Sequence, residues 1–250
     1  MSDTTSAHVG TDTAGPVISV GPVTLTVPGR GQDLHVRVSA PTTGHRLPVV
    51  VFSHGMTLSM DDYTPLAGYW ASHGFVVVQP THLDSLGLAP DDPRTPLIWR
   101  IRADDMTGIL DRLDAVEAQV PGLAGRVDRD RVAVAGHSWG AQTASTLVGA
   151  RVVGADGTPG ESLADPRVRA AVLLCLPGTG GADLSPLAAQ YFPFMSPDFA
   201  ELKTPSLVGG GGAPPPPRGG GGAGGGAPGD PRSPRAPGRL SRWGAGHGRG

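Results

Sequence analysis

A serine in the motif GHSWG, residues 136–140, has the neighbours that a nucleophile of acyl transfer needs. A G-x-S-x-G motif puts its serine on a sharp, strained turn between a strand and a helix, and its small residues let the chain bend tightly. Here the motif directly follows the apolar run Arg131–Ala135 and precedes a helix predicted from Ala141. The motif alone is also compatible with an ordinary glycine-rich turn. With a strand before it and a helix after it, the pattern predicts that Ser138 is the nucleophile.

A second turn predicts where an oxyanion would be bound. The residues SHGM, 53–56, follow the apolar run Pro48–Phe52, and a backbone N–H after such a His-Gly turn can point toward the serine. We expect the N–H groups of Met56 and Trp139 to form the oxyanion hole, helped by the positive end of the helix behind Ser138. The side chain of His54 is expected to brace the loop and not to react.

Apolar runs and helical periods alternate along most of the chain. Short, continuously apolar runs are typical of strands buried on both faces of a parallel sheet, and apolar/polar alternation predicts an antiparallel edge. The buried strands are predicted at Pro48–Phe52, Phe75–Gln79, Arg131–Ala135, Ala170–Leu174 and near Thr204–Val208, the edge strands at Val23–Val27 and Leu34–Ser39, and the helices at Pro65–His73, Leu97–Gln119 and Ala141–Gly149. Charged residues of the long helix, Asp105 among them, are expected to face solvent. The order predicts an α/β fold with a mostly parallel, doubly wound sheet.

Several motifs together resemble those of the α/β-hydrolases. They are LPVVVFSHGM, FVVVQPTHLDS, a long helix with arginines and aspartates, and RVAVAGHSWG. From about residue 17 to 208 the combination is most similar to the chlorophyllase, dienelactone hydrolase and cutinase-like (polyester hydrolase) branch. The resemblance implies the α/β-hydrolase fold and a serine that attacks a carboxylic ester, with a histidine as general base and an acid that orients the histidine.

The resemblance also implies the chain order serine, acid, histidine. His247 is the only histidine after Ser138 and is therefore the candidate base, although its low-complexity surroundings predict no fixed position for it. Asp183 is the candidate acid, and a solvated loop carboxylate or a helix cap is the alternative. Chlorophyllase-like enzymes place an aspartate just after the strand that corresponds to Ala170–Leu174, where this chain has Cys175–Gly178. Cutinase-like enzymes place it just beyond the position of Val208. Cys175 is expected to be a small core residue.

The composition excludes several other classes of protein. The 250 residues include 20 Lys+Arg and 22 Asp+Glu, a formal charge of −2 that is unlike a strongly basic nucleic-acid binder. A single cysteine excludes an intramolecular disulfide framework, and no signal peptide or membrane span is predicted, so we expect a cytoplasmic protein. No cofactor and no metal are predicted, because His82 and Asp84 lack a third ligand at recognisable spacing.

The composition divides the chain into three parts. Residues 1–16 predict a disordered leader, residues 17–208 the hydrolase domain, and residues 209–250 a low-complexity tail, rich in glycine, proline and arginine, that is expected to be disordered. Because the pattern breaks inside a predicted strand, we expect a C-terminally incomplete domain whose last strand or strands are missing or disrupted. A frameshifted reading of GC-rich DNA would explain the tail and fits a chain in which Lys203 is the only lysine. A natural Gly/Pro-rich linker is the alternative.

Two functions follow from these residues. The first is a serine carboxylic-ester hydrolase that forms an acyl-enzyme on Ser138 and takes a small-molecule ester. The alternative is a catalytically impaired α/β-hydrolase, a frameshift or truncation product that lacks the acid and base of the triad. The tail offers too few aromatic side chains to stack on bases, so no nucleic-acid partner is expected. The apolar loop Tyr191–Met195 either forms a wall of an acyl pocket or caps the core, and the pattern determines neither the ester nor the oligomeric state.

Overall fold

The computed structural model describes residues 13–88, 91–154, 156–180, 184, 186–192, 194–210 and 241–242. Its strands are β1 (Val17–Leu25), β2 (Leu34–Pro41), β3 (Leu47–Ser53), β4 (Val76–Pro80), β5 (Val127–His137), β6 (Arg151–Val152), β7 (Val168–Leu174), β8 (Pro197–Asp198), β9 (Ser206–Gly209) and β10 (Ser241–Arg242). Its α-helices are α1 (Thr64–Ser72), α2 (Ile98–Asp111), α3 (Leu113–Gln119), α4 (Trp139–Thr146) and α5 (Pro186–Tyr191), and two short 3-10 turns are η1 (Leu83–Leu86) and η2 (Thr95–Leu97).

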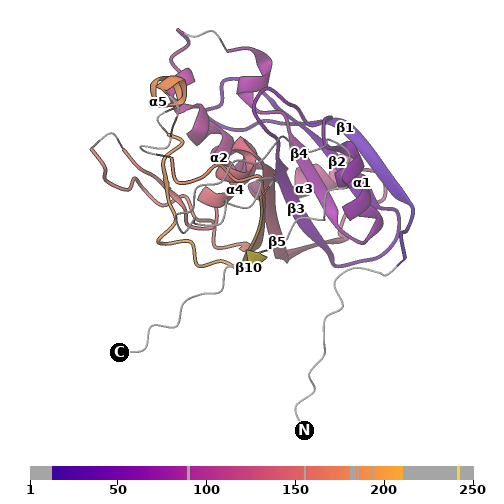
Figure 1. Ribbon diagram of the computed structural model, residues 1–250. Coiled ribbons are helices and arrows are strands. Elements are labelled where there is room, and N and C mark those ends of the chain that lie inside the picture. The colour runs from indigo at the N-terminus through magenta and orange to yellow at the C-terminus, as the bar shows by residue number, and fades with distance from the viewer. Residues whose placement is uncertain are drawn as a thin grey trace, which may run out of the picture.

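One mixed sheet forms the centre of the described part of the chain (Figure 1). Its strand order is β1-β2-β4-β3-β5-β7-β9-β10, and β6 and β8 pair with each other outside it. The strands from β4 to β9 in this order run parallel, whereas β2 and β1 continue one edge antiparallel and β10 pairs antiparallel at the other. The chain therefore winds outward from β3 in both directions, which confirms the predicted doubly wound, mostly parallel sheet.

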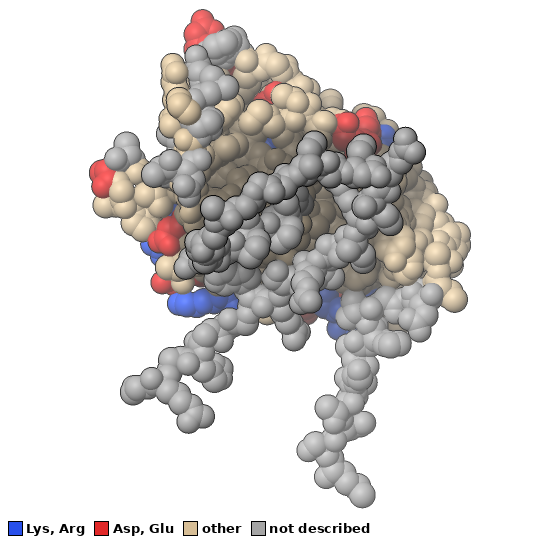
Figure 2. Space-filling view, in the orientation of Figure 1, with Lys and Arg blue, Asp and Glu red and all other residues tan. Residues whose placement is uncertain are grey.

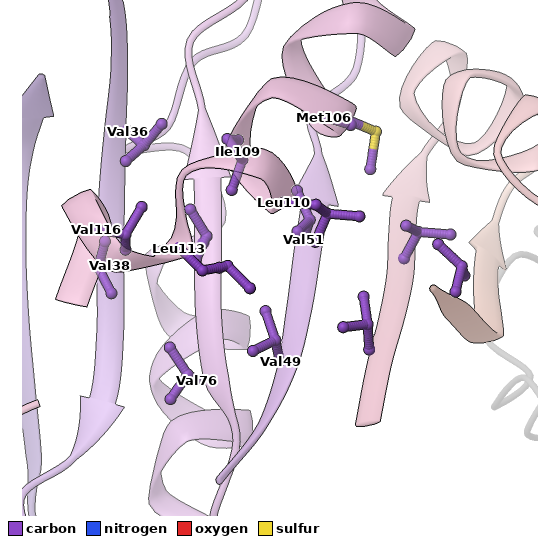
Figure 3. Packing of buried hydrophobic residues seen from close by; sticks show 14 of the residues in the cluster. Val36, Val38, Val49, Val51, Val76, Met106, Ile109, Leu110, Leu113 and Val116 are labelled. Carbon is purple, nitrogen blue, oxygen red and sulfur yellow. The ribbon is translucent and has the colours of Figure 1, made fainter. Parts of the chain in front are cut away.

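Alternate side chains of the parallel strands face two different helical layers. Val49 and Val51 of β3 belong to the large cluster that includes apolar residues of α2, α3 and α4, whereas Val50 and Phe52 pack with Ala67 of α1. Figure 3 shows valines of β2, β3 and β4 lying against the apolar side chains of α2 and α3. Both faces of the central strands are thus buried, as their continuous apolar runs predicted.

The helix predicted over residues 97–119 is two helices. α2 ends at Asp111, Arg112 has the non-helical angles φ −122° and ψ 26°, and α3 begins at Leu113. α3 runs to β1, where the Gln119 side chain accepts the Thr24 N–H and donates to the Thr24 carbonyl. The apolar period predicted the buried faces of both helices, but such a period does not report a change of axis at one residue.

The strand predicted near residues 204–208 is β9, which pairs in parallel with β7 and extends to Gly209. Ser241 and Arg242 pair antiparallel with Val208 and Leu207, so the low-complexity segment contributes β10 to the sheet. The division into leader, domain and tail, and the incompleteness of the domain, stay predictions.

The surface of the described residues is mainly uncharged on the face seen in Figure 2, where acidic and basic side chains are scattered around the edge. Among the described helices, none combines the length and the apolar character that crossing a membrane requires.

Candidate active site

Ser138 lies on a strained turn between β5 and α4. Its backbone angles, φ 55° and ψ −121°, are unfavourable for any residue with a side chain, and they turn the chain sharply from strand to helix. A Cβ on Gly136 would lie 2.1 Å from the Gly140 carbonyl oxygen, and a Cβ on Gly140 would lie 2.0 Å from the Ser53 carbonyl oxygen. Only glycine fits at these two positions, and the strand and helix predicted around the motif are present.

Two backbone N–H groups beside this turn are available as donors. Residues 54–56, here called the oxyanion loop, follow β3, and the close approach of Gly140 to Ser53 and His54 holds this loop against the start of α4. Within the described residues, the N–H groups of Met56 and Trp139 make no hydrogen bond. The Ser138 N–H is instead engaged, since it donates to the Leu174 carbonyl at 2.9 Å. The arrangement can therefore offer two main-chain donors to an oxyanion, and the role of Met56 and Trp139 in an oxyanion hole stays a prediction.

Tyr63 connects the oxyanion loop to the serine turn. Its hydroxyl lies 2.8 Å from Nδ1 of His137 and accepts the Gly55 N–H at 3.4 Å. Burial raises the pKa of the Tyr63 hydroxyl, which therefore keeps its proton and can donate it to His137. Sequence reasoning missed both side chains, because Tyr63 precedes α1 and carries no motif of its own.

Arg102 lies fully buried beneath the oxyanion loop. Its guanidinium donates to both carboxylate oxygens of Asp84 at 2.9 Å, to the His54 carbonyl at 2.9 Å and to the Gly55 carbonyl at 3.2 Å. It also lies over the Trp139 ring, 4.3 Å from the ring centroid. A charged residue of α2 is thus part of the site's interior.

A buried chain of hydrogen bonds ends at the residue before the oxyanion loop. The Ser53 hydroxyl lies 2.9 Å from Nε2 of His82, Nδ1 of His82 lies 2.9 Å from Asp105, and Arg30 donates to Asp105 at 2.7 Å. Burial raises the pKa of Asp105 to about 7 and lowers the pKa of His82 well below its usual value. Although these residue types are those of a catalytic triad, Ser53 is fully buried, so its hydroxyl is not open to a substrate. The prediction that Asp105 faces solvent is wrong.

His82 and Asp84 are the two side chains that were considered as metal ligands and for which no metal was predicted. His82 bonds with Ser53 and Asp105, whereas Asp84 pairs with Arg102. Among the described residues, no group of three or more His, Cys, Asp or Glu side chains could hold a metal ion.

His54 is buried and neutral, as its predicted bracing role requires. Its Nδ1 lies 2.6 Å from the Gly55 carbonyl oxygen, and its Nε2 accepts the His82 N–H at 3.1 Å. Burial, followed by the Arg102 charge, lowers the pKa of His54 from 6.5 to about 4. His54 therefore binds a proton below about pH 6.5 in the unfolded chain but only below about pH 4 in the folded chain.

Acid is thus expected to destabilise the protein through His54 as the pH falls from about 6.5 to about 4. Urea unfolding at pH 7 and pH 4.5 should show a smaller loss of unfolding free energy in His54→Asn than in the parent chain, because asparagine does not titrate. An exposed control, His45→Asn, should lose as much as the parent. Equal losses in the parent and His54→Asn would contradict the assignment.

The candidate acid and base lie outside the described residues. They are Asp183 and His247. Cys175 is described, and the prediction that it is a core residue is wrong: it is exposed, with a left-handed φ of 49°. β7 ends at Leu174, and the Cys175 N–H then donates to the Gly209 carbonyl at 2.6 Å, so the side chain leaves the sheet at this point.

Aromatic side chains cover the Trp139 ring. Phe194 stacks on it with ring centroids 5.3 Å apart, and Phe192 meets it edge-on at 6.2 Å. Phe194 is buried in this cluster, which favours the core-cap interpretation for that residue.

Comparisons with known proteins agree with the fold. The chlorophyllase family model matches residues 31–152. The chain is 28% identical over 122 residues to chlorophyllase type 0 of Chenopodium album (44% of this chain, 31% of that protein) and 25% identical over 138 residues to platelet-activating factor acetylhydrolase of Cavia porcellus (40% and 31%). It spans less than a third of the length of these curated relatives.

Among solved structures, the monoclinic form of Pyrobaculum calidifontis esterase is similar, with a TM-score of 0.50 and 23% identity over 78% of this chain and 66% of that one. The mostly parallel sheet with helices on both faces is the α/β-hydrolase fold. Within that fold, residues 31–152 are similar to the chlorophyllase family.

Proposed function

We propose that the chain is a serine carboxylic-ester hydrolase that acts on a small-molecule ester through an acyl-enzyme on Ser138. The observation that carries this proposal is the strained backbone of Ser138 between β5 and α4, beside the unengaged N–H groups of Met56 and Trp139. Among the described serines, Ser138 alone has a positive φ.

The proposed reaction has two halves. Ser138 Oγ attacks the ester carbonyl and loses its proton to the general base, and the carbonyl oxygen becomes an oxyanion that accepts the Met56 and Trp139 N–H groups. Collapse of this intermediate expels the alcohol, which takes the proton, and leaves an ester bond to Ser138. Water then attacks that ester by the same steps and releases the carboxylic acid. We propose His247 as the base and Asp183 as the acid that orients it.

A catalytically impaired hydrolase is the second candidate. It is favoured by the exposed Cys175 at the end of β7, where the resemblance to chlorophyllase-like enzymes implies an aspartate. In that case Ser138 keeps its turn and its donors but has no partner to accept its proton.

Hydrolysis of p-nitrophenyl butyrate by the full chain separates the two candidates. We expect turnover that Ser138→Ala abolishes, that His247→Ala and Asp183→Ala abolish or greatly reduce, and that the exposed control His45→Ala leaves unchanged. Turnover equal in the parent and Ser138→Ala would exclude the ester-hydrolase proposal for a folded chain. Turnover lost in Ser138→Ala but kept in His247→Ala would retain the nucleophile and reject the proposed base.

A further inference from the structure

We propose that Arg102 and His54 are positioning residues that direct the Met56 N–H toward the oxyanion by holding the other side of the same peptide unit. The inference rests on the proposed function, because it assigns a purpose to the Met56 donor. It concerns side chains that do not touch the substrate and act only through the backbone.

The Gly55–Met56 peptide is held by hydrogen bonds to its carbonyl oxygen. In a trans peptide the C=O and the N–H point in opposite directions. The Gly55 carbonyl oxygen is held from the interior by His54 Nδ1 at 2.6 Å and by Arg102 Nη2 at 3.2 Å. The Met56 N–H must then point away from this buried cluster, and within the described residues it makes no hydrogen bond. Two donors on one carbonyl therefore oppose a flip of this peptide.

The charge of Arg102 makes the Met56 N–H a better donor. A hydrogen bond from a guanidinium to a carbonyl is stronger than a neutral one, and it polarises the peptide so that the N–H at its other end becomes a better donor. Arg102 is fully buried, so water screens this effect little. The side chain thus both orients the Met56 N–H and strengthens it.

Arg102 is itself held in a fixed position by its hydrogen-bond partners. Asp84 holds the guanidinium through two oxygens, and the His54 carbonyl takes a further N–H. The same group lies over the ring of Trp139, the residue that carries the other donor. One side chain therefore contacts both the carbonyl of the Gly55–Met56 peptide and the ring of Trp139. Lysine offers no planar fork and cannot make these contacts together.

An NMR measurement tests the positioning without relying on turnover. The chain has five methionines, so selective ¹⁵N-methionine labelling gives few amide signals, and Met56→Leu identifies the Met56 signal. In Arg102→Lys we expect the Met56 signal to shift or split, while the signal of Met60, whose N–H donates to Thr81 Oγ1, stays in place. The matched control is Arg100→Lys, a partly exposed arginine of the same helix, which should leave both signals unchanged. A folded Arg102→Lys chain with an unmoved Met56 signal would overturn the proposal.

Two substitutions of His54 keep the test decisive if Arg102→Lys fails to fold. The amide nitrogen of His54→Asn stands near the position of Nδ1 and can still donate to the Gly55 carbonyl, whereas that of His54→Gln stands near Nε2 and cannot. We expect the Met56 signal to stay near its parent position in His54→Asn and to move in His54→Gln. The same signal in both variants would contradict the proposal.

Kinetics provide the second readout. Loss of an oxyanion donor lowers kcat by about 10²-fold or more and alters KM little, because the contact forms in the transition state. We expect Arg102→Lys to lower kcat for p-nitrophenyl butyrate by about 10²-fold, and Arg100→Lys to leave it unchanged. If the parent shows no turnover while the Met56 signal responds to Arg102→Lys, the positioning inference holds and the proposed function fails. A lower kcat with an unmoved signal would mean that Arg102 acts by another route.

Discussion

Gly140→Ala is expected to lower the free energy of unfolding by about 3 kcal/mol or more, which is the upper range for an overpacked site. The added Cβ would lie 2.0 Å from the Ser53 carbonyl oxygen and 2.6 Å from the His54 carbonyl oxygen. Both are backbone atoms, so no side-chain rotation can relieve the contact. The clash must push the start of α4 away from the oxyanion loop, and we expect any esterase turnover to be lost as well. Urea unfolding followed by circular dichroism measures the first effect.

Gly68→Ala is the matched control for this substitution. Gly68 lies inside α1, and a Cβ there would meet nothing within 4 Å. Since alanine is the better helix former, this change should stabilise the protein by about 0.5–1 kcal/mol. If Gly140→Ala were as stable as the parent, the elbow and the loop could not be packed as closely as the structure has them.

Arg30→Met is expected to cost about 3–5 kcal/mol, the usual effect of removing one partner of a buried ion pair. Arg30 and Asp105 are each 1% exposed at the side chain, with Nε and Oδ1 2.7 Å apart. Without the guanidinium, the Asp105 carboxyl keeps only its contact with His82 in an interior that disfavours a charge. The midpoint of urea unfolding at pH 7 should fall accordingly.

Two companion variants determine whether the lost charge is the cause. Arg37→Met removes the partner of Asp61 from a pair with exposed side-chain fractions of 22% and 57%, and it should cost less than about 1 kcal/mol. Adding Asp105→Asn to Arg30→Met should recover part of the loss. It removes a buried carboxyl whose pKa is already raised to about 7 beside Arg30 and rises further without it, so that folding must protonate the carboxyl. Equal costs for Arg30→Met and Arg37→Met would show that the buried pair contributes no more than an exposed one.

The sequence predicted the central fold because burial on two faces leaves a local signal. Runs such as Pro48–Phe52 are apolar at every position, and the strand–turn–helix order around Ser138 follows from residues that are neighbours in the chain. The place of residues 54–56 directly after a buried strand was predictable for the same reason. These features depend on short-range patterns that one sequence contains in full.

The interior polar network could not be predicted in this way. Arg102 and Asp105 lie on a helix whose charged positions normally face water, and here they are buried because the loop after β4 and the oxyanion loop pack over them. Their partners are distant in sequence: Asp105 bonds with Arg30, 75 residues before it. Cys175 was misplaced for a related reason, because an apolar run does not report the residue at which a strand leaves the sheet.

Met56 is 36% exposed, and its main-chain N–H is the group proposed to act. A main-chain donor requires only a backbone N–H, which every residue type except proline provides. Substitution of residue 56 by any residue other than proline is therefore expected to change what a ligand meets at the surface and to keep the donor. The requirement for a particular side chain falls instead on Arg102 and His54, which are proposed to hold the Gly55–Met56 peptide.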